Sequence, residues 1–481
     1  MLSGSLHDWR ILRNRCRSGS TAMPQKIKIT EAIDIGSNLE PFIDDFLIQK
    51  LSRSRLVLHR PTPREVAIVH DEPWEGNTSA YWTVFPDGNR FRMYYRGVGH
   101  DFKTGKTSKE VVCYAESKDG KTWTKPELGL FDFRGSKKNN IVWKGFGTHN
   151  FAPFKDSNPQ CKRSHRYKAL ALHQRGLVAF KSSDGIQWSL IQDEPVITKG
   201  AFDSQNLAFW DSARECYVDF HRGFRPRRGK GGVRDIMTCT SSDFINWTEP
   251  EWLDFGSTPS EHLYTNAVTP YPRAPHICVG FPKRFVPTRQ PPHHPTTGIS
   301  DTVFMTSRDG LQWRRWTEAF IRPGLQKERW VNRNNMTAWG ILETKADTTG
   351  CPDELSIYSS EGYYQKDCRM RRFTLRKDGF VSIQADGKGG EMVTKPFNFE
   401  GRKLSLNFST SAAGGVRVEL QTPSAKAIRG FSLDDCDEIF GDELERDVTW
   451  NGKSSLASIR QPVRVRFVIS DADLYAMQFR A

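Results

Sequence analysis

One short phrase recurs along the chain and constrains its fold more than any other feature. The pattern Ser-x-Asp-Gly-x-x-Trp occurs at residues 117–123, 182–188 and 307–313. A variant with phenylalanine in place of glycine spans Ser241–Trp247, and Asp378-Gly379 is a weaker fifth copy. The aspartates lie about 60–70 residues apart. Recurrence at such a regular interval indicates a repeat architecture.

Each repeat contains short runs of β-forming residues separated by turn residues. In the first repeat the runs are rich in Val, Tyr, Phe and Trp and cover residues 79–85, 91–97, 110–117 and 121–126. Four short antiparallel strands in about 60 residues make one blade of a β-propeller. The Asp-Gly pair is then expected to supply the positive-φ turn between the third and fourth strands, and the tryptophan to pack between blades.

The sequence therefore predicts an all-β protein, with a five-bladed β-propeller followed by a C-terminal β-sandwich. The propeller is assigned to residues 31–387, with blades at 71–130, 145–195, 200–255, 260–320 and 328–385. The early strand 41–50 is expected either to complete the last blade or to plug the ring. Over 388–481 the phrase stops and apolar residues alternate with polar ones, which predicts the sandwich. This module is either an accessory sugar-binding module or a scaffold.

The N-terminal residues and the cysteines indicate in which cellular compartment the protein is expected. Residues 1–30 are Arg-rich without the apolar core of a secretory signal, so we expect a disordered or mis-started segment, with Met23 as an alternative start. Nine cysteines without a C-x-x-C favour free thiols in a reducing, cytoplasmic compartment. No apolar run approaches the roughly 18 residues that a membrane helix needs, so no membrane partner is expected.

The net charge indicates which classes of binding partner to expect. The chain has 70 Lys and Arg against 56 Asp and Glu, which gives a formal charge of +14. A basic surface favours anionic partners, either nucleic acid or an acidic glycan. No nucleic-acid-binding motif is present, so the expected partner is a carbohydrate, with an anionic one among the candidates. No clear ligand spacing for a metal occurs, and neither a metal nor a cofactor is expected.

Polar residues stand just ahead of the first apolar run in each repeat. The innermost strands of a propeller line its channel, and their starts converge at one mouth, so these residues nominate a ligand site or an active site. The candidates, in chain order, are Asp71, Glu72, Glu75, His149, Asn150, Asp203, Gln205, Asn206, Glu261, His262, Tyr264, Asn266, Arg333, Asn334 and Asn335. Carboxylates around a cleft without metal or cofactor are typical of glycoside hydrolysis, in which one carboxyl donates a proton and another stays ionised.

This organisation resembles the five-bladed β-propeller glycosidases, the invertases, levansucrases and arabinanases of glycoside hydrolase families 32 and 43. The stretch SSDFINWTEP is similar to their Ser-x-Asp-Leu-x-x-Trp phrase, and the resemblance covers about residues 71–385. It implies a first-blade Asp as nucleophile or base, a second Asp, and a Glu as general acid. By position Asp203 matches the second Asp and Glu261 the acid. For the first blade Asp71 leads, ahead of Asp44, Asp45 and Glu75.

The remaining candidates are assigned to substrate binding: His149, Asn150, Gln205, Asn206, His262, Tyr264, Asn266, Arg333, Asn334 and Asn335. The chain lacks the Asn-Asp-Pro-Asn-Gly, Arg-Asp-Pro and Glu-Cys-Pro motifs of the family, so its substrate is not inferred from the family. The phrase also resembles the sialidase Asp-box, but sialidases have six blades. Two alternatives to a hydrolase stay open. One is a propeller that binds glycan or protein without catalysis. The other is a glycoside phosphorylase, for which Arg222, Lys283 and Arg333 are phosphate-site candidates.

Overall fold

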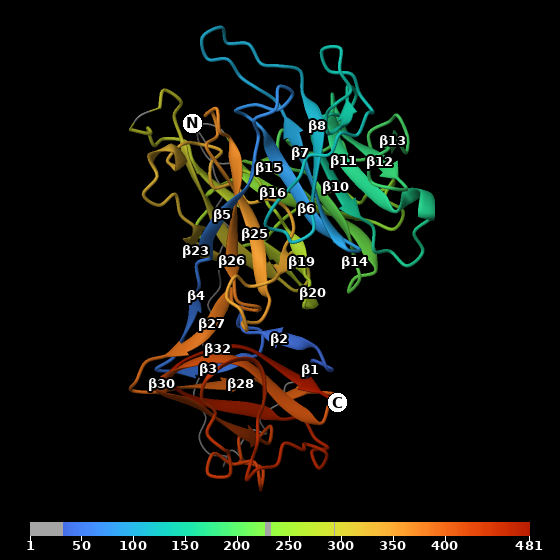
Figure 1. Ribbon diagram of the computed structural model, residues 1–481. Coiled ribbons are helices and arrows are strands. Elements are labelled where there is room, and N and C mark those ends of the chain that lie inside the picture. The colour runs from blue at the N-terminus through green and yellow to red at the C-terminus, as the bar shows by residue number, and fades with distance from the viewer. Residues whose placement is uncertain (1–31, 227–231, 293) are drawn as a thin grey trace, which may run out of the picture.

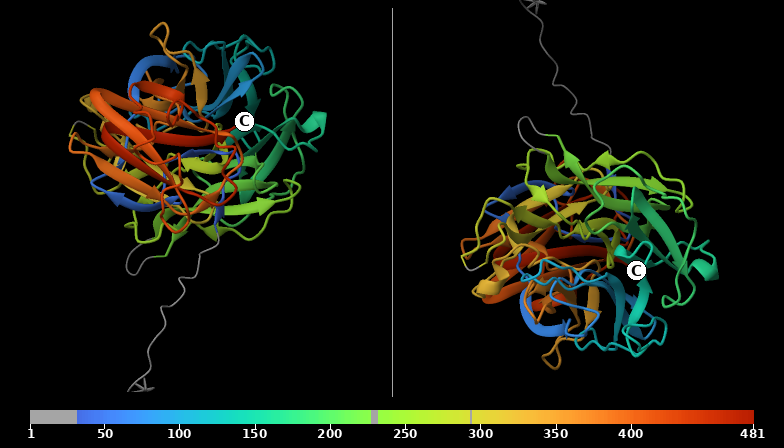
Figure 2. Two further views of the ribbon diagram at one scale, coloured as in Figure 1. Left: turned by 90° about the horizontal axis from the view of Figure 1, so that it is seen from below. Right: turned by 90° about the horizontal axis from the view of Figure 1, so that it is seen from above.

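The computed structural model describes residues 32–226, 232–292 and 294–481, and within them it is built almost entirely of strands. Five sheets stand side by side around a common centre, and the C-terminal domain lies beneath them (Figures 1 and 2). Within the described residues this confirms the predicted five-bladed propeller and all-β class. The predicted segment 1–30 lies outside the described residues. The described helices are the single 3-10 turns η1 (Arg163–His165) and η2 (Lys327–Arg329), and no described helix is long and apolar enough to cross a membrane.

The first three blades are four-stranded antiparallel sheets in chain order. Blade 1 consists of β6 (Ala80–Asp87), β7 (Arg90–Gly97), β8 (Val111–Ser117) and β9 (Ile141–Lys144). Blade 2 consists of β10 (His149–Lys155), β11 (Tyr167–His173), β12 (Gly176–Ser182) and β13 (Ser189–Leu190). Blade 3 consists of β14 (Leu207–Asp211), β15 (Cys216–Arg225), β16 (Val233–Ser241) and β17 (Glu251–Trp252). The fourth strand of blade 1 differs from the prediction, because 121–126 forms only the isolated bridge from Thr124 to Glu116.

Blade 4 has interrupted first and second strands. Its strands are β18 (His262–Leu263), β19 (Thr269–Tyr271), β20 (Ala274–Gly280), β21 (Lys283–Val286), β22 (Ile299–Ser307) and β23 (Arg314–Ile321). Because β18 pairs with β21 and β19 with β20, the two short pairs together act as the inner half of the blade. The break between β20 and β21 contains Pro282, which has no backbone N–H to donate to a ladder.

Blade 5 closes the ring with a strand from the N-terminal side. It consists of β24 (Leu342–Thr344), β25 (Glu354–Glu361), β26 (Arg369–Leu375) and β5 (Thr62–Val69). The antiparallel pairing of β5 with β26 supplies the outer strand, and thus joins the two ends of the propeller segment. The sequence expected residues 41–50 to complete or plug the ring, but β2 (Leu39–Pro41) and β3 (Ile48–Ser52) pair with C-terminal strands instead.

The C-terminal domain is built on two long strands, β30 (Lys403–Gln421) and β32 (Arg464–Arg480), which pair along most of their length. The shorter strands around them are β1 (Ile33–Asp34), β4 (Arg55–Leu58), β27 (Val381–Ala385), β28 (Gly390–Thr394), β29 (Phe397–Asn398) and β31 (Asp442–Asp447). With β2 and β3 they enclose a separate apolar core, as a sandwich requires. Strands β1 to β4 and β27 therefore belong to this domain, although the sequence assigned 31–387 to the propeller.

The recurring phrase forms the turn that was predicted from it. At Ser182–Trp188 the Ser182 hydroxyl accepts from the Gly185 N–H at 2.8 Å, and Gly185 adopts a φ of +77°. Trp188 then packs edge-on against Phe151 of its own blade and Tyr94 of blade 1. Trp123 meets Tyr358 of blade 5 in the same way. The phrase is therefore a device that locks neighbouring blades together.

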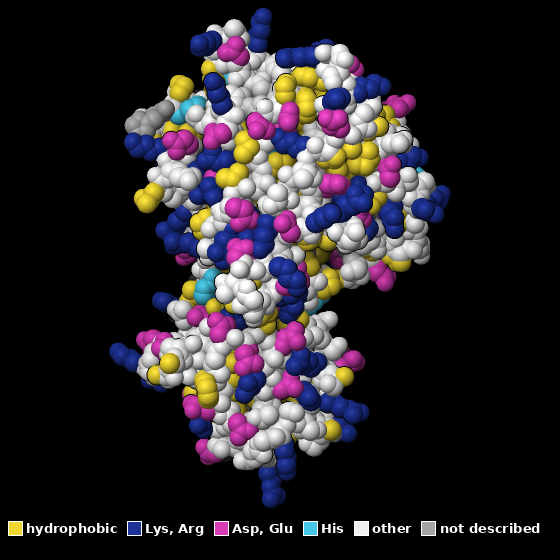
Figure 3. All heavy atoms as spheres, viewed as in Figure 1, with side chains coloured by type: hydrophobic (Ala, Val, Ile, Leu, Met, Phe, Trp, Pro, Cys, Tyr) yellow, Lys and Arg dark blue, Asp and Glu magenta, His cyan; other side chains and the backbone are white. Residues whose placement is uncertain are grey.

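Charged side chains of both signs are mixed on the face of the molecule that Figure 3 shows. On the face shown in Figure 3, lysine and arginine are spread over both domains and interleaved with acidic side chains. The basic side chains of this face are therefore dispersed rather than gathered in one patch.

Candidate active site

The starts of the inner strands converge, and the backbone there adopts unusual conformations. Tyr81, Asn150, Ala267 and Arg333 all have positive φ, between 42° and 70°. A bulky residue such as Tyr81 rarely adopts this region, and such strain clusters at functional sites. We call this region the channel mouth. Gln205, ahead of the first strand of blade 3, donates to the Trp82 carbonyl of blade 1 at 2.7 Å and so joins these two blades.

The predicted amide residues are buried structural groups. Each is at most 1% exposed, and each donates to at least one backbone carbonyl. These residues are Asn150, Gln205, Asn206, Asn266, Asn334 and Asn335. For example, Asn150 donates to the Ser204 carbonyl at 2.6 Å and so ties blade 2 to blade 3. The structure uses these amides to satisfy the carbonyls of the irregular loops, as buried backbone groups require.

Asp203 presents the carboxylate of the channel mouth. Its side chain is 58% exposed, and its Oδ1 lies 3.3 Å from His149 Nε2. The other imidazole nitrogen, Nδ1, lies 2.9 Å from Oε2 of Glu110. We call Glu110, His149 and Asp203 the relay. The Tyr264 hydroxyl is 3.5 Å from the second oxygen of Asp203.

The relay fixes its own charge state. The hydrogen bond from His149 lowers the pKa of Asp203 well below its usual range, against the effect of burial, and Arg222 and Arg333 add to the shift. Burial favours neutral His149, but its hydrogen bonds with Asp203 and Glu110 raise the imidazole pKa above its ordinary value. The pKa of Glu110 is lowered despite burial, because His149 and Arg96 favour the carboxylate. Two carboxylates with lowered pKa thus flank one imidazole with a raised pKa.

Four cationic side chains line the other side of the channel mouth. Arg222 of β15, Arg234 of β16, Lys283 of β21 and Arg333 form this set, which we call the cation group. Arg222 Cζ and Lys283 Nζ lie 4.7 Å and 4.0 Å from the centre of the Tyr264 ring, and Arg234 Cζ is 5.6 Å from it. Arg333 donates to the Tyr363 hydroxyl at 2.7 Å. Tyr264 is therefore the ring around which the cations gather. His262 lies beside them, and its Nδ1 accepts from the backbone N–H of Arg234 at 3.2 Å.

The structure does not bring Glu261 to the relay. Its two oxygens accept from Arg284 at 3.1 Å and from Arg315 at 2.5 Å. Glu261 lines a separate cavity of about 230 Å³ between blades 3 and 4. Among the described residues, Asp203 and Glu261 have no interaction partner in common. Glu261 was nominated because it stands ahead of the inner strand of blade 4, but its side chain pairs with Arg284 and Arg315 instead.

The first-blade carboxylates also lie apart from the relay. Asp71 is 67% exposed and accepts from Lys125 at 2.9 Å. Lys125 also binds Glu75, which is fully buried. Burial favours protonation of Glu75, but His70 and Lys125 outweigh it and lower its pKa to about 2. Glu75 is therefore a structural ion at the base of blade 1.

The acidic residues of the early strand lie at the junction of the two domains. Asp44 accepts from Arg308 at 2.7 Å, and Asp45 pairs with Arg314 at 3.4 Å. Both arginines belong to blade 4 or to the turn that leads into its last strand. The two carboxylates therefore join the C-terminal domain to the propeller.

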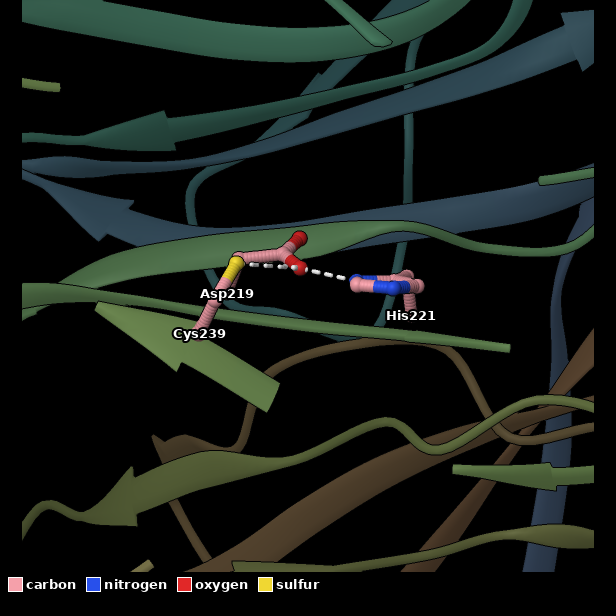
Figure 4. A group of neighbouring side chains, drawn as sticks. All are labelled: Asp219, His221 and Cys239. Atoms are coloured by element: carbon pink, nitrogen blue, oxygen red, sulfur yellow. Dashed lines mark hydrogen bonds and ion pairs between the residues drawn. The ribbon is translucent and has the colours of Figure 1, made fainter. Parts of the chain in front are cut away.

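One buried group combines ligand types that bind metals. Asp219 and His221 of β15 and Cys239 of β16 lie within 4.8 Å of one another (Figure 4). Their arrangement does not fit a metal well, because Asp219 already pairs directly with His221 Nδ1, and burial and Asp219 raise the pKa of the Cys239 thiol. A protonated thiol is a poor metal ligand. We read the group as a buried hydrogen-bond network.

Sequence reasoning found part of the site and missed the rest. Asp203, His149, Tyr264 and Arg333 precede inner strands, where the pattern was sought. The pattern did not include Glu110, because Glu110 precedes the third strand of blade 1 and not the first. It did not include Tyr81, because Tyr81 belongs to an apolar run. The signal that could have found Arg96 and Arg234 is a charged residue inside a buried strand, which is rare without a partner.

Comparisons with protein-family models and with curated proteins find no match. Solved structures of glycosidases do match. A family 43 arabinoxylan arabinofuranohydrolase from Bacillus subtilis, in complex with cellotetraose, is 12% identical, with a TM-score of 0.43 over 88% of this chain and 99% of its own. A family 32 β-fructofuranosidase from Bombyx mori is 7% identical (TM-score 0.41; 87% and 95%). An endo-arabinase from Bacteroides thetaiotaomicron is 11% identical (0.39; 65% and 98%).

Proposed function

We propose that the protein cleaves a glycosidic bond of a poly- or oligosaccharide at the channel mouth, with Asp203 as the ionised catalytic carboxylate. The observation that carries this proposal is the state of Asp203. It is a solvent-accessible carboxylate, kept ionised by His149, and it faces the Tyr264 hydroxyl. An ionised carboxylate beside a sugar attacks the anomeric carbon, activates water, or stabilises the oxocarbenium-like transition state.

The proton for the leaving oxygen is assigned to His149. Glycoside cleavage needs a protonated group as well as an ionised one. Glu110 has a lowered pKa and is ionised, so it cannot serve as the acid. His149 has a raised pKa and lies against Asp203, so it keeps a proton to higher pH than an ordinary histidine at the place where the bond would break. Glu110 then fixes the orientation of the imidazole from behind.

A groove next to the relay offers room for a chain of sugars. His149 and Glu110 also line a cavity of about 1090 Å³ between blades 1 and 2. Its walls carry Trp74 and Phe133, whose rings can pack on the apolar faces of sugars. A substrate longer than one sugar would thus extend from the relay into this groove, which favours an oligosaccharide or polysaccharide.

The proposal is tested by turnover of a panel of aryl glycosides and polysaccharides, read as released reducing ends. The wild-type protein should cleave at least one member. Asp203→Asn should lower that rate about 10²–10⁴-fold, as expected for loss of an acid–base or nucleophilic group, while Asp71→Asn, an exposed carboxylate of blade 1, should leave it unchanged. Saturable sugar binding without turnover would instead show a binding propeller, and equal rates for the two variants would refute the role of Asp203.

A further inference from the structure

The cation group lacks the carboxylates that other basic residues of the same strands have. Arg225 on β15 pairs with Asp235 at 2.5 Å, and Arg284 on β21 pairs with Asp301 at 2.7 Å. Among the described residues, none of the salt bridges includes a member of the cation group. Pairing is the rule for buried charges in proteins, so four unpaired cations at one place require an explanation.

Burial makes this unpaired state costly. Lys283 is 0% exposed, and its Nζ has the Asn332 side-chain oxygen as a partner at 3.1 Å. Burial and the charges of Arg333, Arg222 and Arg234 lower the pKa of Lys283 well below its ordinary value, and only Asp203 opposes them. The Nε atoms of Arg234 and Arg333 are buried without a hydrogen-bond acceptor. The site therefore has more hydrogen-bond donors and more basic groups than the acceptors and carboxylates of the protein pair with.

An oxyanion supplies what is missing. Guanidinium and ammonium groups bind carboxylate, sulfate and phosphate through charge-assisted hydrogen bonds, and arginine matches the geometry of these groups. The cation group comes from blades 3 and 4 and the start of blade 5, so its members converge on one point from three sides. The aromatic rings of Tyr264, Phe224 and Phe285 lie within 5.6 Å of the Arg234 guanidinium carbon.

We propose that the cation group forms an oxyanion subsite beside Asp203. This subsite binds an oxyanion, which is either the carboxylate of a uronate sugar or inorganic phosphate. The inference rests on the proposed function in placing a carbohydrate at Asp203, and it specifies that the substrate or its co-substrate is anionic. Because the subsite adjoins Asp203, the anion would lie next to the bond that is cleaved.

Binding of inorganic phosphate, glucuronate and glucose to the full-length protein tests the proposal by isothermal titration calorimetry. We expect saturable binding of phosphate or glucuronate, weakened by salt, and much weaker binding of glucose. Arg234→Gln should weaken anion binding at least about tenfold, the change expected for loss of a charged hydrogen bond. The matched control Arg446→Gln, at an exposed site of β31, should have no effect.

Lys283→Met separates a binding role from a structural one. Replacing a buried lysine, whose pKa is lowered and which has no carboxylate partner, by an apolar side chain should leave the thermal stability unchanged or higher, yet anion binding should fall about tenfold or more. Wild-type binding should also take up protons, because an anion raises the lowered pKa of Lys283; titrations in buffers of different ionisation enthalpy measure this uptake. Lys345→Met, at an exposed lysine, is the control.

The outcomes distinguish this inference from the proposed function. Preference for phosphate or for glucuronate identifies the source of the oxyanion, and either supports the subsite. If neither anion binds, or if Arg234→Gln and Lys283→Met bind as tightly as wild type, the subsite is refuted, even when neutral glycosides are cleaved with dependence on Asp203. If anions bind as expected but no glycoside is cleaved, the subsite stands and the glycosidase proposal fails.

Discussion

His149 is the residue on which the charge balance of the relay depends. It lies between two carboxylates, and its raised pKa means that it gains a proton more readily in the folded protein than in the unfolded chain. The resulting stabilisation is fully present below the unfolded pKa of about 6.5 and is lost as the pH rises through the folded value. The same titration governs catalysis if the imidazolium is the proton donor.

The pH dependence of kcat/KM tests this assignment. Activity should fall as the pH rises through the raised pKa of His149, above about 6.5, and should fall in acid only below the ordinary Asp range near 3.9, because the pKa of Asp203 is lowered. His149→Gln should lower the rate and remove the alkaline limb. An alkaline limb that persists in this variant would assign the proton to another group.

At the scale of single elements, the recurring turn is where sequence and structure agree most closely. Gly185 has a positive φ, and a Cβ placed there would lie 2.6 Å from Arg92 Nη1 and 2.7 Å from the Tyr94 hydroxyl. The serine, aspartate, glycine and tryptophan of the phrase each have a local physical role. For this reason the turn, the blades and their number could be predicted from one chain.

Gly185→Ala measures how much the turn contributes to blade packing. The substitution should lower the free energy of unfolding for two reasons. Alanine in the left-handed backbone conformation costs about 1–2 kcal/mol, and its clash with blade 1 costs about 1–3 kcal/mol. Gly88→Ala is a matched control, because Gly88 also has positive φ but open space around it, so it should incur only the first cost. Equal destabilisation in urea denaturation would show that the turn does not hold the blades together.

The site was less predictable than the fold, for a reason that also lies at the scale of elements. Sequence position places a residue near the start of an inner strand but does not say which way its side chain turns. Asp203 and Glu261 have the same relation to their strands, yet one faces His149 and the other faces Arg284 and Arg315. Glu110 reaches the relay from a third strand, through a contact that only the tertiary fold creates.

At the scale of the whole molecule, the two domains are interleaved along the chain. Strands β1 to β4 belong to the C-terminal domain, while β5 closes the propeller. Glu40 of β2, in the C-terminal sheet, is 2% exposed and pairs with Arg308 and His276 of blade 4. Long-range pairing of this kind leaves no local pattern in sequence, so the domain boundary could not be placed from periodicity alone.

Arg308→Gln tests whether this contact joins the domains. Losing Arg308 leaves the buried Glu40 with only His276, and the free energy of unfolding should fall by about 3–5 kcal/mol, the cost of breaking a buried ion pair. Arg314→Gln is the control, because its partner Asp45 is 78% exposed and an exposed pair contributes at most about 1 kcal/mol. Similar losses in calorimetric unfolding of the two variants would contradict a joined pair of domains.

We propose that catalysis takes place at the relay and not at Glu261. The most direct measurement is kcat of Asp203→Asn and Glu261→Gln on the same glycoside. The relay predicts a loss of about 10²–10⁴-fold for Asp203→Asn and nearly wild-type kcat for Glu261→Gln, whose effect should fall on stability through Arg284 and Arg315. Full activity in Asp203→Asn together with an inactive, folded Glu261→Gln would contradict it.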